Sequence, residues 1–450
     1  MPRRPLPAAA ILVAPLAAAG AVALAAGAQL RDAPPTTHVA VHVTEWEFTS
    51  VSPAAAPAGT VVFTIRNDGV FGHDFSIEGH TTPLIPGGGS ATLTAFFVNP
   101  GTFTYFSTVD DWDREMWGGF TVTGPAVTPP ATTPPRTATG ATVREPALPL
   151  RAIHDVPLPG AASRFDYQSI DVKKRRLFIA HLGAGQLLSF DLARQRVAGI
   201  VGGVADVRGV LAVPSLGLVY AAATGKHSLM TFDERTLRRR AIAPAGDFPD
   251  GIAYDPVTGR VFVSDVSGER ETVFRARTGR RIGAIALGGD PGNVQYDARA
   301  KRILVTVGSR DELALVDPRR LRVTGRVRLD GCEHPHGLEV ASAWRRAYVA
   351  CEENATLAVI DLRSRRQTGR VSVGDDPDVL DLDPALKRLY VAAESGVVSV
   401  FDLRSGVRKL GEGLLDPNAH SVAVDPRTHR VYFPLEDVNG RPVLRVMRPT

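Results

Sequence analysis

The chain has 450 residues, of which 44% are hydrophobic and 22% charged, and a formal net charge of +5 at pH 7. This length exceeds that of one ordinary domain and predicts two or three, each able to bury a core. The basic residues are scattered along the chain, which excludes a nucleic-acid groove, because such a groove needs a clustered basic face.

The N-terminal residues have the pattern of an export signal. Arg3 and Arg4 precede an uncharged run rich in Ala, Leu and Val, and Ala26-Gly27-Ala28 matches an A-x-A cleavage site. We therefore expect residues 1–28 to be a signal peptide or, because the apolar run approaches the length of a bilayer span, an uncleaved N-terminal anchor. The protein is then exported, to the periplasm, the cell surface or the medium, and contacts a membrane only through this segment.

The segment 38–124 alternates apolar and polar residues in the manner of a β-sandwich, as in V-H-V-T-E-W-E-F, G-T-V-V-F-T-I-R-N and P-G-T-F-T-Y-F. Its order of strands and turns resembles that of the cupredoxin family. The resemblance implies that His73, in the motif G-H-D-F, stands at the position of the first copper ligand.

The same resemblance implies that a blue (type 1) copper site has been lost. Such a site needs two imidazoles and a thiolate, with a weak axial Met. Ser107 stands at the Cys position, Asp111 or Trp112 at that of the second His, and Met116 at that of the axial ligand. We therefore expect no blue copper centre. His73, Asp111 and Met116 either form a weaker metal site or belong to a sandwich that serves for docking.

Residues 125–147 are rich in Pro, Thr and Ala, which is typical of a semi-rigid linker between domains. The remaining block, 148–450, repeats a unit of 42 residues, once lengthened to 44, and each unit predicts four short strands. We mark each unit by the residue just before its first strand. The marked positions are Asp166, Arg208, Asp250, Gly292, His336, Asp378 and His420.

Seven such units predict a seven-bladed β-propeller, because a ring lets each sheet bury both faces. After His420 only three strands fit before Thr450, so the segment from Ala147 is expected to add the fourth strand and to close the ring. The motifs R-L-Y-V-A-A and R-A-Y-V-A-C resemble the YVTN-repeat (YncE-like) propeller family. The expected fold is thus all-β, with a cupredoxin-like sandwich followed by a seven-bladed propeller.

The marked residues are expected to surround one end of the central channel, and a convergent polar ring is the default place for a ligand. The end of the second strand, about fifteen residues on, should lie beside each mark, which pairs Asp166 with His181 and Asp250 with Asp265. The first pair is an oriented base or a salt link. The second chelates a cation or shares a proton. A plain hydrated channel mouth is the alternative to a functional site.

The densest group of metal-binding side chains is C-E-H-P-H-G, residues 332–337, which faces Cys351 in the same hairpin. Cys332, His334, His336 and Cys351 match the donors of a zinc or copper site, although C-x-H-x-H is not zinc-finger spacing. Because exported cysteines usually oxidise, we favour a Cys332–Cys351 disulfide, beside which His334 and His336 can still bind metal.

The leading functional hypothesis is an exported two-domain binding or scaffold protein. Its ligand would be a small molecule, a metal ion (copper or zinc) or another exported protein. One alternative is a copper redox protein, because nitrous oxide reductase also joins a seven-bladed propeller to a cupredoxin, in the reverse order and with its cysteines present. Another is a lyase or hydrolase with Asp166, His181, His336 or His420 as acid or base. The sequence has no nucleophile elbow, P-loop or dinucleotide motif, and leaves open whether the protein is an enzyme.

Overall fold

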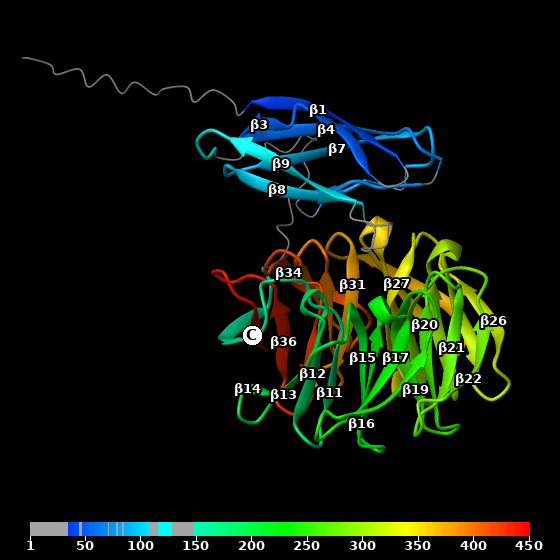
Figure 1. Cartoon of the computed structure of the whole chain (residues 1–450). Coiled ribbons are helices and arrows are strands. Elements are labelled where there is room, and N and C mark those ends of the chain that lie inside the picture. Colours follow the sequence, from blue (N-terminus) through cyan, green and yellow to red (C-terminus); the bar gives the residue numbers. More distant parts are fainter. Residues whose placement is uncertain are drawn as a thin grey trace, which may run out of the picture. The chain divides into compact units, whose positions relative to one another are not determined.

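The computed structural model describes residues 35–44, 47–70, 72–77, 80–82, 85–107, 116–127 and 147–450 (Figure 1). The chain divides into two compact units, Met1–Thr137 and Ala138–Thr450. Both are built from β-strands, which confirms the expected all-β class. The helical elements within the described residues are single 3-10 turns: η2 (Leu182–Ala184), η3 (Thr224–Lys226), η4 (Gly308–Arg310), η5 (Ser342–Trp344) and η6 (Glu352–Asn354).

The N-terminal unit has two sheets around one core. The first, in spatial order, is β2 (Phe48–Ser52), β1 (Thr36–Val43), β4 (Gly59–Asn67) and β7 (Ser90–Phe97). The second is β3 (Ala55–Pro57), β9 (Trp117–Thr123), β8 (Gly101–Phe106), β5 (Ser76–Ile77) and β6 (His80–Thr81). Alternate residues of β4 are buried, as the period of a strand requires. They meet aromatic rings such as Phe75 and Phe120 in a single cluster, so the segment is a β-sandwich.

The C-terminal unit consists of seven four-stranded antiparallel sheets. The first four are β11–β14 (Gln168–Asp171, Arg176–His181, Gln186–Asp191, Arg196–Val201), β15–β18 (Val207–Val213, Leu218–Ala223, Ser228–Asp233, Arg239–Pro244), β19–β22 (Pro249–Asp255, Arg260–Asp265, Arg270–Arg275, Arg281–Ala286) and β23–β26 (Pro291–Asp297, Arg302–Val307, Glu312–Asp317, Arg322–Arg328). The next two are β27–β30 (Pro335–Ala341, Arg346–Cys351, Thr356–Asp361, Arg366–Ser372) and β31–β34 (Pro377–Asp383, Arg388–Ala393, Val397–Asp402, Arg408–Leu414).

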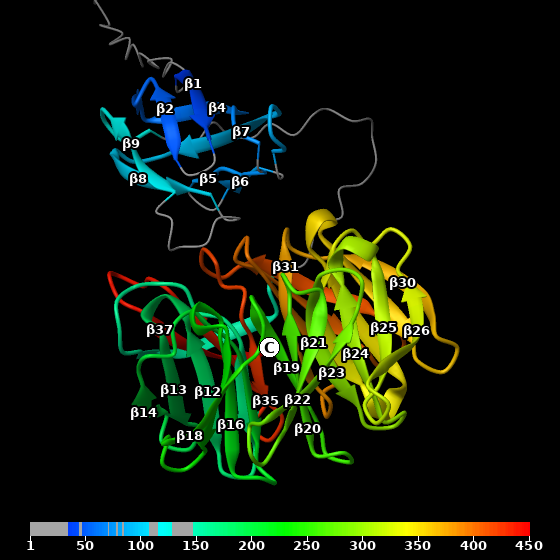
Figure 2. The same ribbon diagram turned by 45° about the vertical axis from the view of Figure 1, so that its right-hand side comes forward.

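The seventh sheet joins the two ends of this unit in the order β10 (Leu150–Pro157), β37 (Val443–Pro449), β36 (Arg430–Leu435) and β35 (Ala423–Asp425). The pairs Leu150↔Pro449 and Pro157↔Val443 fix the register of β10 on β37. The first strands of successive sheets contact one another, and β35 contacts β11. The sheets therefore form a closed seven-bladed propeller around a central channel (Figures 1 and 2), and the expected closing strand is confirmed.

The repeated motifs explain the layers of each blade. Second strands such as β12 and β20 are apolar on both faces, because they are covered by the blades on either side. Outer strands such as β14 alternate and expose one face. The Asp that ends a first strand closes the following turn: Asp255 accepts the backbone N–H of Val257 at 2.8 Å.

A β-bulge lies at the marked position in five blades. Pro249 pairs with Asp265 and Ile252 with Val263, so three steps along β19 oppose two along β20. The same shift occurs in β15, β23, β27 and β31. A bulge redirects the side chain of the extra residue. In these five blades it thus turns the marked residue away from the regular ladder at the start of the inner strand.

The expected export signal, residues 1–28, and most of the expected linker, residues 128–146, fall outside the described residues. Among the residues that are described, no helix has both the length and the hydropathy of a membrane span.

Candidate functional site at the channel mouth

Six polar marked residues meet where the inner strands begin, at one end of the propeller channel. Arg208 Nη1 lies 3.7 Å from Asp166 Oδ2, and His336 Nε2 lies 3.7 Å from Asp378 Oδ1 and 4.0 Å from Asp250 Oδ2. The sixth residue is His420, which lies beside Asp166 and Asp378. The seventh position, Gly292, contributes no side chain; a Cβ there would lie 2.8 Å from the Cα of His336.

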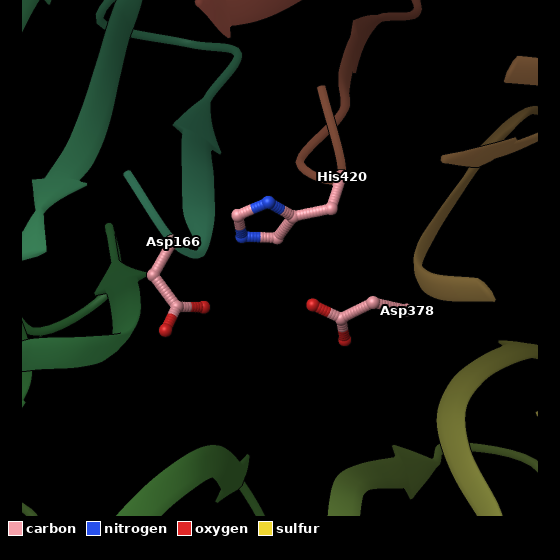
Figure 3. A group of neighbouring side chains, drawn as sticks. All are labelled: Asp166, Asp378 and His420. Atoms are coloured by element: carbon pink, nitrogen blue, oxygen red, sulfur yellow. The ribbon is translucent and has the colours of Figure 1, made fainter. Parts of the chain in front are cut away.

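The most enclosed part of the mouth is the group of Asp166, Asp378 and His420 (Figure 3). These residues are only 3%, 6% and 1% exposed, respectively. One ligand atom from each lies within 4.8 Å of the other two. Figure 3 shows the imidazole and both carboxyl groups turned toward a common space. We call these three residues the triad.

The imidazole of His420 is held in one tautomer. Its Nδ1 lies 3.0 Å from the backbone oxygen of Asn418, which can only accept, so Nδ1 carries the hydrogen. Nε2 is then a free lone pair, buried and without a hydrogen-bond partner among the described residues. Burial lowers the pKa of His420 to about 4, against the opposing charge of Glu394. A neutral imidazole whose second nitrogen donates to a carbonyl is the usual state of a metal ligand.

A second group shares Asp378. One ligand atom each from His336, Glu352 and Asp378 again lies within 4.8 Å of the others. The His336 ring has Glu352 Oε1 at 3.3 Å from Nδ1 and the Tyr167 hydroxyl at 3.2 Å from Nε2. Burial alone would lower the pKa of His336, but Glu352, Asp378 and Asp250 raise it to about 9. In the absence of a bound cation His336 is therefore protonated.

Acidic groups dominate the mouth. Burial, reinforced by the charge of Asp250, raises the pKa of Asp166 to about 7. Burial also holds the pKa of Asp378 well above its usual range, against the charge of His336. One oxygen each of Asp250 and Asp378 is buried without a hydrogen-bond partner within the described part of the chain. Such a site disfavours its own ionised form and gains from a cation.

Two arginines are the permanent cations near these acids. Arg164 forms a two-point ion pair with Glu394, which itself lies 3.4 Å from His420 Nδ1. Arg208 lies over the ring of Phe248, 4.6 Å from its centroid. Arg208 Nη1 also lies 3.7 Å from Asp166 Oδ2, so its charge offsets part of the charge of that triad carboxylate.

Close approach of neighbouring blades sets these positions. Ser421 Oγ donates to the backbone oxygen of Asp166 at 2.6 Å, and Thr306 Oγ1 donates to that of His336 at 2.6 Å. A Cβ added to Gly337 would lie 1.8 Å from the backbone oxygen of Asp378. Because Gly337 has no side chain, the next blade can approach closely and place its own marked residue, Asp378, beside His336.

Two residues expected beside the marks have other partners. His181 stacks on Phe165, with ring centroids 4.0 Å apart, and its Nε2 lies 3.1 Å from Ser163 Oγ. Asp265 pairs with Arg270 at 2.7 Å and accepts the N–H groups of residues 247 and 248. No hydrogen bond or ion pair within the described residues joins His181 to Asp166 or Asp265 to Asp250. Both side chains support the blades instead.

The Cys332–Cys351 disulfide is present, with Cα atoms 5.2 Å apart, which confirms that expectation and rules out the two sulfurs as thiolate ligands. It ties the loop that carries His334 and His336 to the strand end that carries Glu352. His334 lies 2.9 Å from Asp290 and 3.2 Å from Glu352. His334 therefore contacts the outer side of Glu352, while His336 contacts its inner side.

Three glutamates of the mouth were not anticipated from the sequence. Glu352, Glu394 and Glu436 follow one another at intervals of 42 residues, one position beyond the expected second-strand residues. The strand that ends at Cys351 buries that residue, and the next residue turns toward the mouth. A search for a periodic acid, rather than for pairs fifteen residues apart, would have found them.

The channel behind the mouth contains a cavity of about 760 Å³ lined by the inner strands. Its wall is largely apolar but includes Glu339 and Asp381. Burial raises their pKa values to about 8 and about 7, respectively.

The N-terminal sandwich offers a poorer set of donors. His73 is buried, and its backbone bridges to Ile85. The Ser107 hydroxyl donates to Asp74 at 3.1 Å, and Met116 packs in the core. Asp111 lies outside the described residues. Where side chains are described, both groups of three His, Cys, Asp or Glu residues placed to share an ion lie in the propeller.

Comparison with known proteins supports the propeller fold. No family model and no curated protein matches the sequence. Among solved structures, a chain of Kuenenia stuttgartiensis hydrazine synthase superposes with a TM-score of 0.56 at 16% identity, over 70% of this chain and 99% of the other. That protein contains a β-propeller, and at this identity the likeness extends to the fold alone.

Proposed function

We propose that the protein is an exported metal-binding protein whose propeller holds a divalent cation at the channel mouth, ligated by Asp166, Asp378 and His420. The observation that carries this proposal is the buried Nε2 lone pair of His420, which faces two buried carboxyl groups and has no hydrogen-bond partner in the described structure. A buried, unpaired acceptor costs about 1–3 kcal/mol, and a cation removes that cost.

The donor set narrows the choice of ion. One imidazole and two carboxylates suit Zn²⁺, Mn²⁺ and related divalent ions, whereas a blue copper site needs a thiolate. Both cysteines are oxidised to a disulfide, so neither is available as a thiolate. We therefore expect a redox-inactive or hard-ligand metal site rather than a blue copper centre.

The disulfide also supports the proposed location, because such bonds persist in oxidising compartments outside the cytoplasm. In the sandwich we propose a cupredoxin-like module that serves for docking. The hydroxyl that replaces the thiolate, that of Ser107, is already engaged by Asp74. On this reading the metal of the protein lies in the propeller, not in the sandwich.

A lyase or hydrolase working at the same mouth is the second candidate. The observation that favours it is the protonated His336, whose Nε2 contacts the Tyr167 hydroxyl. A charged imidazole beside a hydroxyl can donate a proton to a bound substrate. This role would use the same acids and is compatible with a bound cation.

The test is calorimetric titration of the full chain with Zn²⁺ and with Mn²⁺ after treatment with a chelator, alongside elemental analysis of the untreated protein. We expect His420→Ala to lower the affinity for the ion at least about 10-fold, because removal of a metal ligand should weaken binding at least as much as removal of a residue that orients one. The matched control is His154→Ala, an exposed imidazole on β10. Absence of metal binding by the wild-type chain, or equal binding by both variants, would contradict the proposal.

A further inference from the structure

Asp378 belongs to both groups of potential ligands at the mouth. The triad places it with Asp166 and His420, and the second group places it with His336 and Glu352. Its side chain is 9% exposed, and one of its oxygens is buried without a hydrogen-bond partner in the described structure. A carboxylate has two oxygens and can bind one ion with each.

We infer that the mouth is a dinuclear site for two divalent cations bridged by the Asp378 carboxylate, the first completed by Asp166 and His420 and the second by His336 and Glu352. This inference rests on the proposed function, since it needs the triad to bind metal. It adds a second ion and gives Asp378 a bridging role.

The spacing of the donors permits two ions. Atoms that lie within 4.8 Å of one another can surround an ion at 2.0–2.2 Å after small side-chain rotations. Ions that share a carboxylate lie about 3.5–4 Å apart in two-metal sites. His420 and His336 approach Asp378 from different blades. His420 lies between β34 and β35, whereas His336 lies within β27.

The mouth holds more acids than permanent cations. Two guanidinium groups, those of Arg164 and Arg208, face seven carboxyl groups: Asp166, Asp250, Glu352, Asp376, Asp378, Glu394 and Glu436. Carboxyl groups gathered in a buried site disfavour one another's ionised form, and bound cations stabilise that form.

The ligands of the second ion are held together by contacts outside the triad. Glu352 Oε1 lies 3.3 Å from His336 Nδ1, and Glu352 Oε2 lies 3.2 Å from His334 Nδ1. The Cys332–Cys351 disulfide ties the segment before His334 to the end of β28, directly before Glu352. His336 and Glu352 are therefore placed side by side at the mouth.

The experiment measures stoichiometry on the full chain, stripped with a chelator and titrated with Zn²⁺, with bound metal counted after gel filtration. We expect two ions per chain for the wild type, one for His336→Ala and for its conservative counterpart His336→Gln, and two for the exposed control His154→Ala. Thermal melts check that each variant is folded. With Mn²⁺, two bridged ions should give a spin-coupled signal that Asp378→Asn removes.

The outcomes separate the two proposals. One ion in the wild type, lost in His420→Ala but kept in His336→Ala, overturns the dinuclear site and leaves the proposed function standing. Two ions that both persist in His336→Ala, or two ions without spin coupling, also overturn it. No bound ion at all overturns both.

Discussion

Two imidazoles in the same mouth have opposite protonation states. Burial lowers the pKa of His420 to about 4, whereas surrounding carboxylates bring that of His336 to about 9 despite burial. The difference comes from their neighbours: Arg164 and Arg208 oppose the charge of Glu394 at His420, whereas His336 contacts three acids. One histidine is therefore ready to bind a cation, and the other must first lose a proton.

At this scale we predict that Glu394→Gln weakens Zn²⁺ binding about 10-fold without abolishing it. The carboxylate of Glu394 lies 3.4 Å from His420 Nδ1 and supports the basicity of the imidazole, and the amide keeps the shape but loses the charge. Calorimetry on the full chain provides the measurement. Glu353→Gln, an exposed acid outside the mouth, should leave the affinity unchanged. Equal affinities in both variants would show that Glu394 has no such role.

In five blades, the element that builds the mouth is the bulged start of the inner strand. The bulge turns the marked side chain inward, and the glycine that follows in some blades lets the next blade approach. At Gly337 a Cβ would lie 1.8 Å from the backbone oxygen of Asp378, so any larger residue must push the two blades apart. Blade spacing and ligand geometry therefore depend on the same residue.

We predict that Gly337→Ala lowers the free energy of unfolding by about 1–3 kcal/mol and weakens metal binding through displacement of Asp378. The matched control is Gly202→Ala, where an added Cβ meets nothing within 4 Å. Chemical denaturation measures stability, and titration measures binding. A Gly337→Ala protein as stable and as metal-competent as the control would show that the blades tolerate the displacement.

The same bulge explains which parts of the site were predictable from the sequence. The repeat interval located the blades and the six polar marks, because one period of sequence is one blade. The residues expected beside the marks were chosen one position too early, and the glutamates that follow them were missed. Pro335 pairs with Cys351, and a step of one residue along a strand moves the side chain to the other face. Glu352 rather than Cys351 therefore faces His336, which periodicity alone could not show.

At the scale of the whole molecule, ring closure creates the site. Asp166 belongs to the first blade and His420 to the last, and they meet because β10 pairs with β37 and β35 contacts β11. The need for a fourth strand in the last blade was visible in the sequence, so this closure was predictable. An ion that binds across the junction would stabilise the closed ring, because it binds the folded state alone.

The stability of the metal-free protein should fall as pH rises, and a bound metal ion should offset part of this loss. Many buried carboxyl groups of the propeller have pKa values raised by burial to about 7 or 8, far above those of an unfolded chain. They include Asp166, Glu234, Glu271, Glu339, Asp381 and Glu436. Above pH 6.5 the folded state keeps protons that the unfolded chain has lost, and His336 has the same sign because its pKa is raised to about 9. His420, with a pKa lowered to about 4, affects only lower pH.

We predict that the chelator-treated protein loses stability as pH rises from about 5 to 8, between the carboxyl pKa values of the unfolded chain and those of about 7 and 8 in the folded state, by about 1.4 kcal/mol per pH unit for each proton retained on folding. Denaturant titrations at several pH values measure the slope. Glu271→Gln removes a buried carboxyl group outside the triad, which accepts a hydrogen bond from Ser264. This variant should reduce the slope by up to the contribution of one proton. Saturating Zn²⁺ should offset the loss more at pH 8.5 than at pH 6.5, because the ion replaces protons on the mouth residues. A metal-free protein that gains stability over this range would contradict the assignment of these buried acids as protonated.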